Sequence, residues 1–557
     1  MKVLRPATLR VFSLLVVVYS LVGAIVAPNP LTTSANQVQT IPRSIPQTDV
    51  NPLGATFFLD REVETWKKEH TLKMARDAGI GWIRQMFPWD SIEPQKGRFW
   101  DDYGNSTWDK FDQIVELAQR YNMRIIARLD RPPDWASQNA AIPAGMPVDP
   151  VEFGNYVYRV VQRYKGKIQY YQIWNEPNLA AEWGNQPVDP KAYVSLLRIA
   201  YQKAKQADPN ALILSAPLAQ TTETGPLNLN ELDYLNGMYA AGAKDYFDIL
   251  SANAYGFDKP PTDPPSRDTL NFQRVVLLHE IMVQNRDDKK AVWLNEFAWN
   301  ASPPSFPADK LYWGRVSEEE QAAYTREAIE LARTWDWLGV IGIWYFRQVG
   351  DILATDRSDY YFRIVDVDFT PRLVYYELQK LAPNYLVAGV GMHEDTHGAV
   401  QTGGGWHAVL DPSASGGTIL ESDQPGDVLT FTFSGTDLTL VHAEGPGLGR
   451  ASLSVDGSPV RSRPKDKQGQ TVLDFYAPSP VAGVHTRVVS GLPSGKHVFQ
   501  IKTLPAEDQG HPGIGATADA FIVENRGSSF GLFYRRLGLL AVGLLAFGSS
   551  FVIWRSR

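Results

Sequence analysis

Two glutamates that follow short apolar segments are the residues of this chain best suited to do chemistry. Asn175 and Glu176 follow the apolar segment 170–174, and Glu296 lies just beyond the apolar segment 292–294. Cleavage of a glycosidic bond requires such a pair, because one carboxyl group protonates a poor leaving group while the other stabilises or captures an oxocarbenium-like centre. Mutual repulsion and unequal surroundings can separate the two pKa values, so that one group is protonated and the other ionised near neutral pH. Either glutamate alone is explained as well by a salt bridge at a rim, whereas the two together favour catalysis.

The elements that must position these glutamates lie between Gly54 and about Pro383, where short apolar runs alternate with longer amphipathic segments. This alternation is typical of parallel strands joined by crossover helices. We expect strands at 54–59, 82–87, 124–129, 169–174, 212–216, 247–254, 292–296 and 340–346, and helices that include 108–121, 153–164, 190–207 and 318–336. Eight repeats predict a (β/α)8 TIM barrel of the α/β class, with a doubly wound open sheet as the alternative. In a barrel, Glu176 and Glu296 end the fourth and seventh strands and can face one another across the mouth.

The segments around both glutamates resemble a known group of enzymes. Trp174-Asn175-Glu176-Pro177 and Leu294-Asn295-Glu296 are similar to the acid/base and nucleophile signatures of glycoside hydrolase clan A, especially families 39 and 5. Arg84, Trp89 and Ile92-Glu93-Pro94 with Gly97 resemble the clan's pattern at the second strand, and the resemblance covers about residues 54–383. It implies an O-glycoside hydrolase with a retaining mechanism, in which Glu176 is the acid/base, Glu296 is the nucleophile, and the carboxyl groups lie about 5 Å apart.

The same resemblance implies roles for side chains near the pair. Asn175 would bind the sugar 2-hydroxyl, Arg84 would hold the nucleophile ionised, and Tyr255 would donate a hydrogen bond to it. The clan often has histidine two residues before this tyrosine, whereas this chain has Asn253, so the substrate contacts at that position stay open. Trp344 resembles the tryptophan that floors the sugar subsite, and a place in the core is its alternative.

Two further tryptophans, Trp89 and Trp135, lie in segments that follow the second and third predicted strands. Indole rings stack well on the apolar faces of sugars, so both could contact the substrate. Ordinary packing in the fold explains them equally well.

The overall composition excludes several other functions. A formal charge of −7 and a pI near 5.8 give no electrostatic support for nucleic-acid binding. The chain has no cysteine, and its nine histidines suggest no metal-ligand spacing, so we predict no metal and no cofactor. The 16 tryptophans suit a carbohydrate cleft, although large barrels also bury many of them. The expected partner is therefore a carbohydrate substrate.

From residue 387 to 525 the pattern changes to short, partly alternating apolar runs separated by Gly, Pro, Ser and Asp. We expect strands at 428–433, 438–441, 451–455, 497–502 and 520–523. Such runs predict an all-β sandwich, similar to the jelly-roll domains beside bacterial carbohydrate enzymes. Trp406 and His407 could stack on a sugar or fill the core of this sandwich, and a plain spacer is the simplest role for the domain.

Both ends of the chain predict membrane attachment. Three basic residues precede an uncharged run that ends at residue 27, so residues 1–27 form an export signal that is either cleaved or kept as an anchor. A second uncharged run, 537–554, has arginines on both sides and predicts a transmembrane helix. We therefore expect a protein of the cell membrane whose catalytic domain lies on the extracellular side.

The composition of residues 28–52 and 526–536 is polar and typical of flexible linkers. The barrel at 53–386 and the β-sandwich at 387–525 lie between them. We expect the chain to cleave O-glycosidic bonds of an oligo- or polysaccharide outside the cell. A catalytically silent glycan-binding surface protein and a transglycosylase that uses the same covalent intermediate are the alternatives.

Overall fold

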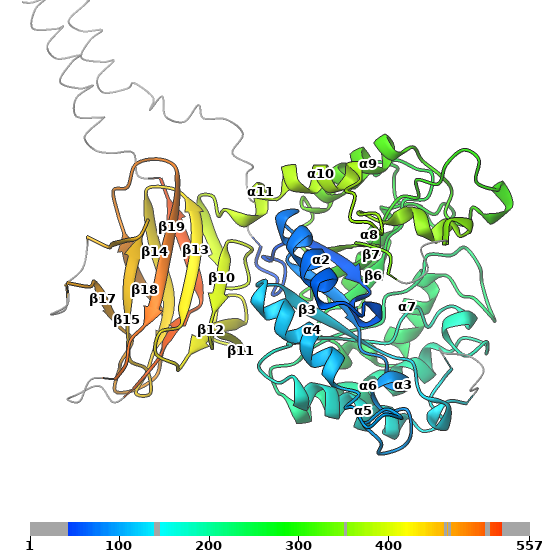
Figure 1. Ribbon diagram of the computed structural model, residues 1–557, viewed down its shortest axis with the longest axis horizontal. Helices are drawn as coiled ribbons and strands as arrows, with labels where there is room; N and C mark the ends of the chain where they lie inside the picture. The colour runs from blue at the N-terminus through cyan, green and yellow to red at the C-terminus, as the bar shows by residue number, and fades with distance from the viewer. Residues whose placement is uncertain are drawn as a thin grey trace, which may run out of the picture.

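The computed structural model describes residues 43–138, 145–349, 354–461, 465, 469–506 and 513–525, which form an α/β barrel and a separate β domain (Figure 1). The predicted export signal at 1–27, the linker at 526–536 and the transmembrane helix at 537–554 lie outside the described residues. Within the described ranges, no helix has the length and apolar character needed to cross a membrane.

A closed sheet of parallel strands forms the centre of the barrel. The strands are β1 (Leu53–Phe57), β2 (Trp82–Met86), β3 (Arg124–Leu129), β4 (Tyr170–Ile173), β5 (Leu212–Leu214), β6 (Leu250–Asn253), β7 (Val292–Phe297) and β8 (Leu338–Ile343). Their order is β5-β4-β3-β2-β1-β8-β7-β6, and a parallel bridge between Leu214 and Ile249 joins the two edges. The predicted (β/α)8 barrel is therefore confirmed, and the open sheet is excluded because both edges are paired.

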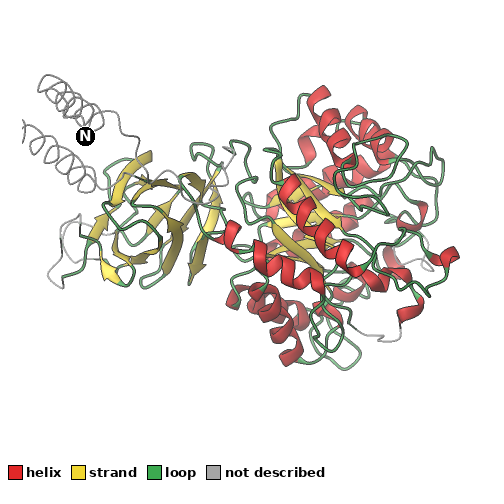
Figure 2. Ribbon diagram, turned by 90° about the horizontal axis from the view of Figure 1, so that it is seen from above, coloured by secondary structure: helices red, strands yellow, loops and turns green. Residues whose placement is uncertain are grey.

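Helices surround these strands on the outside (Figure 2). They are α2 (Thr65–Asp77), α3 (Trp89–Ile92), α4 (Asp109–Arg120), α5 (Pro150–Arg163), α6 (Pro190–Ala207), α7 (Glu231–Ala240), α8 (Arg274–Gln284), α9 (Glu318–Ala332), α10 (Leu373–Leu381) and α11 (Pro383–Leu386). Local sequence fixes where several of them begin. Asp149 and Asp189 each accept a hydrogen bond from the backbone N–H of the second residue of α5 and α6, and proline, which has no N–H, occupies the first helical position in both. The carboxyl ends of all strands then meet at one mouth, which is where the predicted glutamates stand.

The β domain consists of antiparallel strands. They are β9 (Gly391–Glu394), β10 (Val400–Gly403), β11 (His407–Leu410), β12 (Thr418–Ser422), β13 (Val428–Ser434), β14 (Asp437–Glu444), β15 (Arg450–Val455), β16 (Ser458–Pro459), β17 (Val472–Asp474), β18 (Val481–Val489), β19 (Lys496–Thr503), β20 (Ala516–Ala518) and β21 (Ala520–Glu524). The larger sheets have the orders β10-β13-β19-β15-β16, with β17 beside β15, and β18-β14-β21-β9. Phe431 of the first sheet stacks on Phe521 of the second, with ring centroids 4.1 Å apart. The predicted all-β domain is thus confirmed, and its core lies between these sheets.

The chain from 43 to 52 differs from the flexible linker that its composition indicates. Val50 is 1% exposed, and the segment lies under the barrel at the amino ends of the strands. Trp293 Nε1 donates to Gln47 O at 2.9 Å, and the Tyr170 hydroxyl donates to Gln47 Oε1 at 2.8 Å. Arg43 Nη1 donates to Leu338 O at 2.6 Å. Polar residues are ordered here because each finds a partner at the barrel floor, which composition alone does not reveal.

Candidate active site

Glu296 ends the seventh barrel strand and is held by two donors. Its side chain is 6% exposed. Arg84 Nη1 donates to Oε1 at 2.7 Å, and the Tyr255 hydroxyl donates to Oε2 at 2.7 Å. Burial and the charges of Glu296 and Glu176 raise the pKa of Tyr255 well above its usual value, so its hydroxyl keeps the proton that it donates. One carboxylate is therefore fixed in a single orientation, with a cation on one oxygen and a neutral donor on the other.

Arg84 is buried at the centre of a hydrogen-bond network. Besides Glu296, its guanidinium donates to Gln172 Oε1 at 2.8 Å, to Thr56 Oγ1 at 3.2 Å and to Asn175 Oδ1 at 2.8 Å. Because the Asn175 oxygen accepts from Arg84, the amide nitrogen of Asn175 is left to donate elsewhere. The network therefore orients the asparagine beside Glu176 as well as the carboxylate of Glu296.

The backbone turns sharply between the end of the fourth strand and Glu176. Trp174 has φ +71° and Glu176 has φ +41°, a region that residues other than glycine rarely adopt. Trp174 N donates to Leu129 O, Trp174 Nε1 donates to Glu182 O at 2.8 Å, and Glu176 N donates to Pro217 O at 2.9 Å. Contacts with the surrounding structure thus stabilise a backbone conformation that is unfavourable for these residues by themselves, as is common at functional sites.

Glu176 has a different environment from Glu296. Asn253 Nδ2 donates to its Oε1 at 2.7 Å, and Asn253 pairs in register with Glu296 on the neighbouring strand. Burial and the charges of Glu296 and Glu182 raise the pKa of Glu176 to about 8, although the Asn253 hydrogen bond and Arg128 act in the opposite direction. Glu176 is therefore set to carry a proton at neutral pH, while Glu296 forms an ion pair with Arg84.

A cleft of about 240 Å³ opens beside this network. Arg84, Glu182, Phe58 and Trp344 are among the residues that line it. The half-buried ring of Trp344 meets Phe58 edge to face, with centroids 5.8 Å apart. Trp344 thus lines a cleft together with Arg84, the partner of Glu296, whereas Glu176 and Glu296 are not themselves among the lining residues; the role of Trp344 as an aromatic floor stays a prediction.

Trp89 and Trp135 are not among the residues that line this cleft either. Trp89 is completely buried, with its ring 5.3 Å from those of Trp135 and Tyr156, and its Nε1 donates to Glu93 Oε2 at 2.9 Å. Trp135 is half-buried, and its Nε1 donates to Glu93 O at 3.1 Å. Packing and the Glu93 hydrogen bond give the fully buried Trp89 a structural role, whereas contact of the half-buried Trp135 with substrate stays a prediction.

Three polar residues of the site were missed as functional side chains. Gln172 Oε1 accepts from Arg84 and from Asn295 Nδ2, the latter at 2.6 Å, and Asn253 holds Glu176. Each is a carboxamide inside or at the end of an otherwise apolar strand. A buried polar group needs a partner, so this pattern is the signal that could have identified them.

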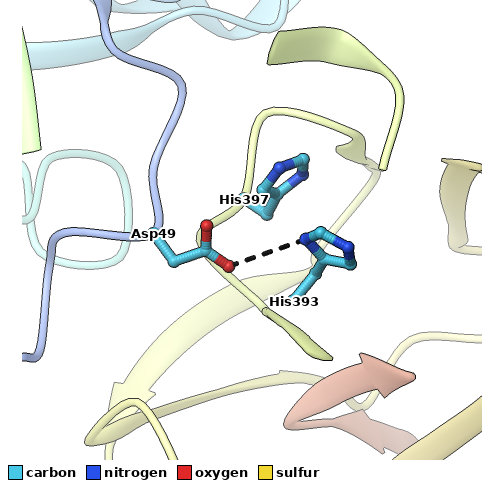
Figure 3. Close-up of side chains that lie close together, drawn as sticks. All are labelled: Asp49, His393 and His397. Atoms are coloured by element: carbon cyan, nitrogen blue, oxygen red, sulfur yellow. Dashed lines mark ion pairs between the residues drawn. The ribbon is translucent and has the colours of Figure 1, made fainter. Parts of the chain in front are cut away.

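A separate cluster, Asp49, His393 and His397, offers ligand atoms that all lie within 4.8 Å of one another (Figure 3). His393 Nδ1 lies 4.0 Å from Asp49 Oδ2, and His393 Nε2 contacts Gly389 O at 2.9 Å. His397 Nδ1 accepts from Ala399 N at 3.0 Å, so coordination at that atom would break this hydrogen bond. The cluster joins segment 43–52 to β9 and the following turn, far from the glutamate pair at the mouth.

Comparison with known protein families adds to this geometry. A model described as glycosyl hydrolase family 10 matches residues 74–216, about a quarter of the chain. The matched part runs from α2 to just beyond β5 and includes Arg84, Asn175 and Glu176. This match confirms the resemblance to the glycoside hydrolases of clan A. Together with the barrel and its carboxyl pair, it gives the class of the protein, an O-glycoside hydrolase.

Three solved structures are similar to the chain over most of its length. A family 39 glycoside hydrolase from the gut symbiont Bacteroides cellulosilyticus WH2 is 17% identical, with TM-score 0.45, and the match covers 83% of this chain and 82% of that one. The family 39 enzyme from Xanthomonas axonopodis pv. citri is 13% identical, with TM-score 0.45 and coverage of 85% and 99%. A monomeric β-xylosidase from Caulobacter crescentus CB15 is 11% identical, with TM-score 0.44 and coverage of 83% and 97%. At these values no substrate and no residue role carries over to this chain.

Proposed function

We propose that this chain is a retaining glycoside hydrolase in which Glu176 is the acid/base and Glu296 the nucleophile. The observation that carries the proposal is the unequal treatment of the two carboxyl groups. Glu296 accepts from the Arg84 cation and from Tyr255, whereas Glu176 lies in a site whose burial and neighbouring charges raise its pKa to about 8. Glu296 is suited to attack the anomeric carbon and Glu176 is suited to donate a proton, as a retaining mechanism requires.

The reaction follows from this division. Glu176 transfers its proton to the glycosidic oxygen as the bond to the anomeric carbon breaks, and a Glu296 oxygen bonds to that carbon. Loss of the leaving group then leaves Glu176 ionised. It removes a proton from a water molecule, whose oxygen attacks the anomeric carbon and releases Glu296. The free amide nitrogen of Asn175 can donate to a sugar hydroxyl throughout these steps.

Assays of the full chain on aryl glycosides with good and poor leaving groups test the role of Glu176. Glu176→Ala should lose about 10²- to 10⁴-fold on the poor leaving group, which needs a proton, and far less on a dinitrophenyl leaving group, which does not. Glu116→Ala, a change at an exposed glutamate of α4, is the matched control and should keep full activity. Equal losses on both leaving groups in Glu176→Ala would reject the acid/base role.

A mechanism-based label tests the role of Glu296. A 2-fluoro-glycoside should form a stable covalent adduct on Glu296, and nuclear magnetic resonance should show that the first product keeps the anomeric configuration of the substrate. An adduct on another residue would remove Glu296 from the nucleophile role. Inversion at the anomeric carbon would exclude the retaining mechanism.

We also propose where the enzyme acts, and this part of the proposal is supported by the sequence alone. The uncharged run 537–554 with arginines on both sides and the export signal at 1–27 predict a barrel tethered outside the cell, acting on an oligo- or polysaccharide. Protease added to intact spheroplasts should digest the barrel and leave the extreme C-terminus protected. Full protection of the barrel would place it inside the cell.

A further inference from the structure

A second cavity, of about 660 Å³, lies between the floor of the barrel and the β domain. Residues of β10, β11 and β12 line it on the β-domain side. These strands lie on the side of the β domain that faces the barrel (Figure 1). Hydrogen bonds between the domains border it, from Arg76 Nη2 to Gln401 Oε1 at 3.3 Å and from Leu410 N to Asn210 Oδ1 at 3.2 Å. Its volume falls in the range of about 300–1,000 Å³ that is typical of small-ligand sites.

The lining of this cavity is strongly basic although the whole chain is acidic. Five lysines and arginines line it: Arg76, Arg120, Arg124, Lys165 and Lys167. Among the described residues on its walls, Asp208 is the one carboxylic acid, and it is 3% exposed with Oδ1 accepting from Asn210 N. The chain as a whole carries a formal charge of −7. The positive lining is therefore a local feature that favours an anionic ligand.

Four of these five cations have no carboxylate within ion-pair distance in the described part of the chain. They are Arg76, Arg124, Lys165 and Lys167, whereas Arg120 pairs with Glu69 at 2.7 Å. Asp395 is the buried acid that acts electrostatically on Arg124, and burial raises the pKa of Asp395 to about 7, so it offsets the Arg124 charge only in part at neutral pH. The cavity thus presents charge that the folded protein does not itself neutralise.

The other lining side chains suit a sugar better than a bare phosphate. Gln119, Asn122 and Gln169 bring carboxamides to the cavity, and Trp406, which is 6% exposed and packs in the core of the β domain, borders it. Gln169 Nε2 and Trp406 Nε1 are buried donors without a hydrogen-bond partner among the described residues. Amides and an indole N–H match sugar hydroxyls. We propose that this cavity is a non-catalytic binding site for an acidic oligosaccharide of the uronate type.

The site is independent of the catalytic mouth. Arg124 and Gln169 stand at or just before the amino ends of β3 and β4, whereas Glu176 follows the carboxyl end of β4. The length of a barrel strand, about 3.3 Å per residue, therefore separates the cavity from the cleft. Binding here would hold an acidic chain on the enzyme without occupying the mouth, and it requires the β domain, which supplies the second wall.

Titration calorimetry of the full chain with a tetragalacturonate probe and with neutral cellotetraose tests the proposal at low salt. Lys165→Glu combined with Lys167→Glu changes two exposed side chains, so folding is not at risk. Affinity for the acidic probe should fall about tenfold or more in this variant and in Arg124→Gln, and it should weaken with added salt in the wild type. Lys289→Gln, at an exposed lysine that does not line the cavity, should bind as the wild type does.

Failure of this site and failure of the proposed catalysis are separable. Glu296→Gln should abolish turnover yet bind tetragalacturonate normally, and the two-lysine variant should hydrolyse a small aryl glycoside at the wild-type rate. Equal affinity of wild type and variant, equal binding of acidic and neutral probes, or no binding by the wild type would each overturn the proposal. Binding to anionic lipid vesicles in place of the uronate would also overturn it.

Discussion

The Asn253 hydrogen bond lowers the pKa of Glu176, which burial and neighbouring charges raise. Asn253 Nδ2 donates to Glu176 Oε1 at 2.7 Å, which favours the ionised carboxylate, against burial and the charges of Glu296 and Glu182. Leucine has a similar size, so Asn253→Leu removes the donor without opening room for water. The pKa of Glu176, about 8 in the intact site, should therefore rise.

The size of this rise follows from the strength of the lost hydrogen bond. A hydrogen bond to a charged group contributes about 1.5–3 kcal/mol, and about 1.4 kcal/mol corresponds to one pKa unit. The amide also interacts with the protonated carboxyl group, although more weakly, so part of the effect cancels. We expect an increase of about one unit.

The assay is kcat/KM against pH for a glycoside with a poor leaving group. Since only protonated Glu176 can act as the acid, activity falls as pH rises through its pKa, and the midpoint of the alkaline limb should move from about 8 to about 9 in Asn253→Leu. Thr56→Val, which removes a partner of Arg84 but no partner of Glu176, should leave that midpoint in place. A midpoint that stays fixed or moves to lower pH in Asn253→Leu would refute this account of Glu176.

Three other predictions follow from contacts in the site and at the barrel floor. Tyr255→Phe removes the donor to Glu296 Oε2, so kcat should fall about 10- to 100-fold with little change in KM, and an unchanged kcat would exclude a role for this hydroxyl. Because the folded-state pKa of Glu176 is raised above its ordinary value of 4.5, its contribution to stability is present below that value and lost as pH rises through about 8. Glu176→Gln should therefore melt about 2–3 °C above the wild type at pH 9 and no higher near pH 4, as calorimetry can check. A soluble fragment that begins at residue 53 should have a lower melting temperature, or a lower expression level, than one that begins at residue 43. The shorter fragment lacks the Gln47 contacts to Tyr170 and Trp293. Equal melting temperatures would contradict the structural role of segment 43–52.

The barrel was predictable because its strands are buried on both faces. Val292–Phe297 is completely buried, and such strands appear in sequence as short apolar runs that helix patterns separate. The positions of Glu176 and Glu296 at the barrel mouth were predictable for the same reason, since both residues stand at the carboxyl ends of these runs. The predicted bounds of individual elements differ from the observed bounds by a few residues. For β6, the predicted strand 247–254 contains an observed strand only at Leu250–Asn253.

Long-range partners account for what the sequence did not reveal. Trp89 and Trp344 are both tryptophans beyond strand ends, yet Trp89 is covered by Trp135 and Tyr156 whereas Trp344 lines the cleft. The order in segment 43–52 depends on Trp293, which lies about 250 residues away along the chain. No local pattern encodes such a contact, because it exists only once the barrel has closed.

Gln172 links the two similar Asn-Glu pairs of the site. Its Oε1 accepts from Arg84 Nε at 2.8 Å and from Asn295 Nδ2 at 2.6 Å, so it connects residues of the fourth, second and seventh strands. Asn295 is thereby bound to the network through its amide nitrogen, whereas Asn175 bonds Arg84 through its oxygen. Arg84 pairs with Glu296. The chemical difference between the two glutamates therefore rests on partners from other strands, Arg84 and Tyr255 for Glu296 and Asn253 for Glu176, together with burial and neighbouring charges, rather than on their own sequence motifs.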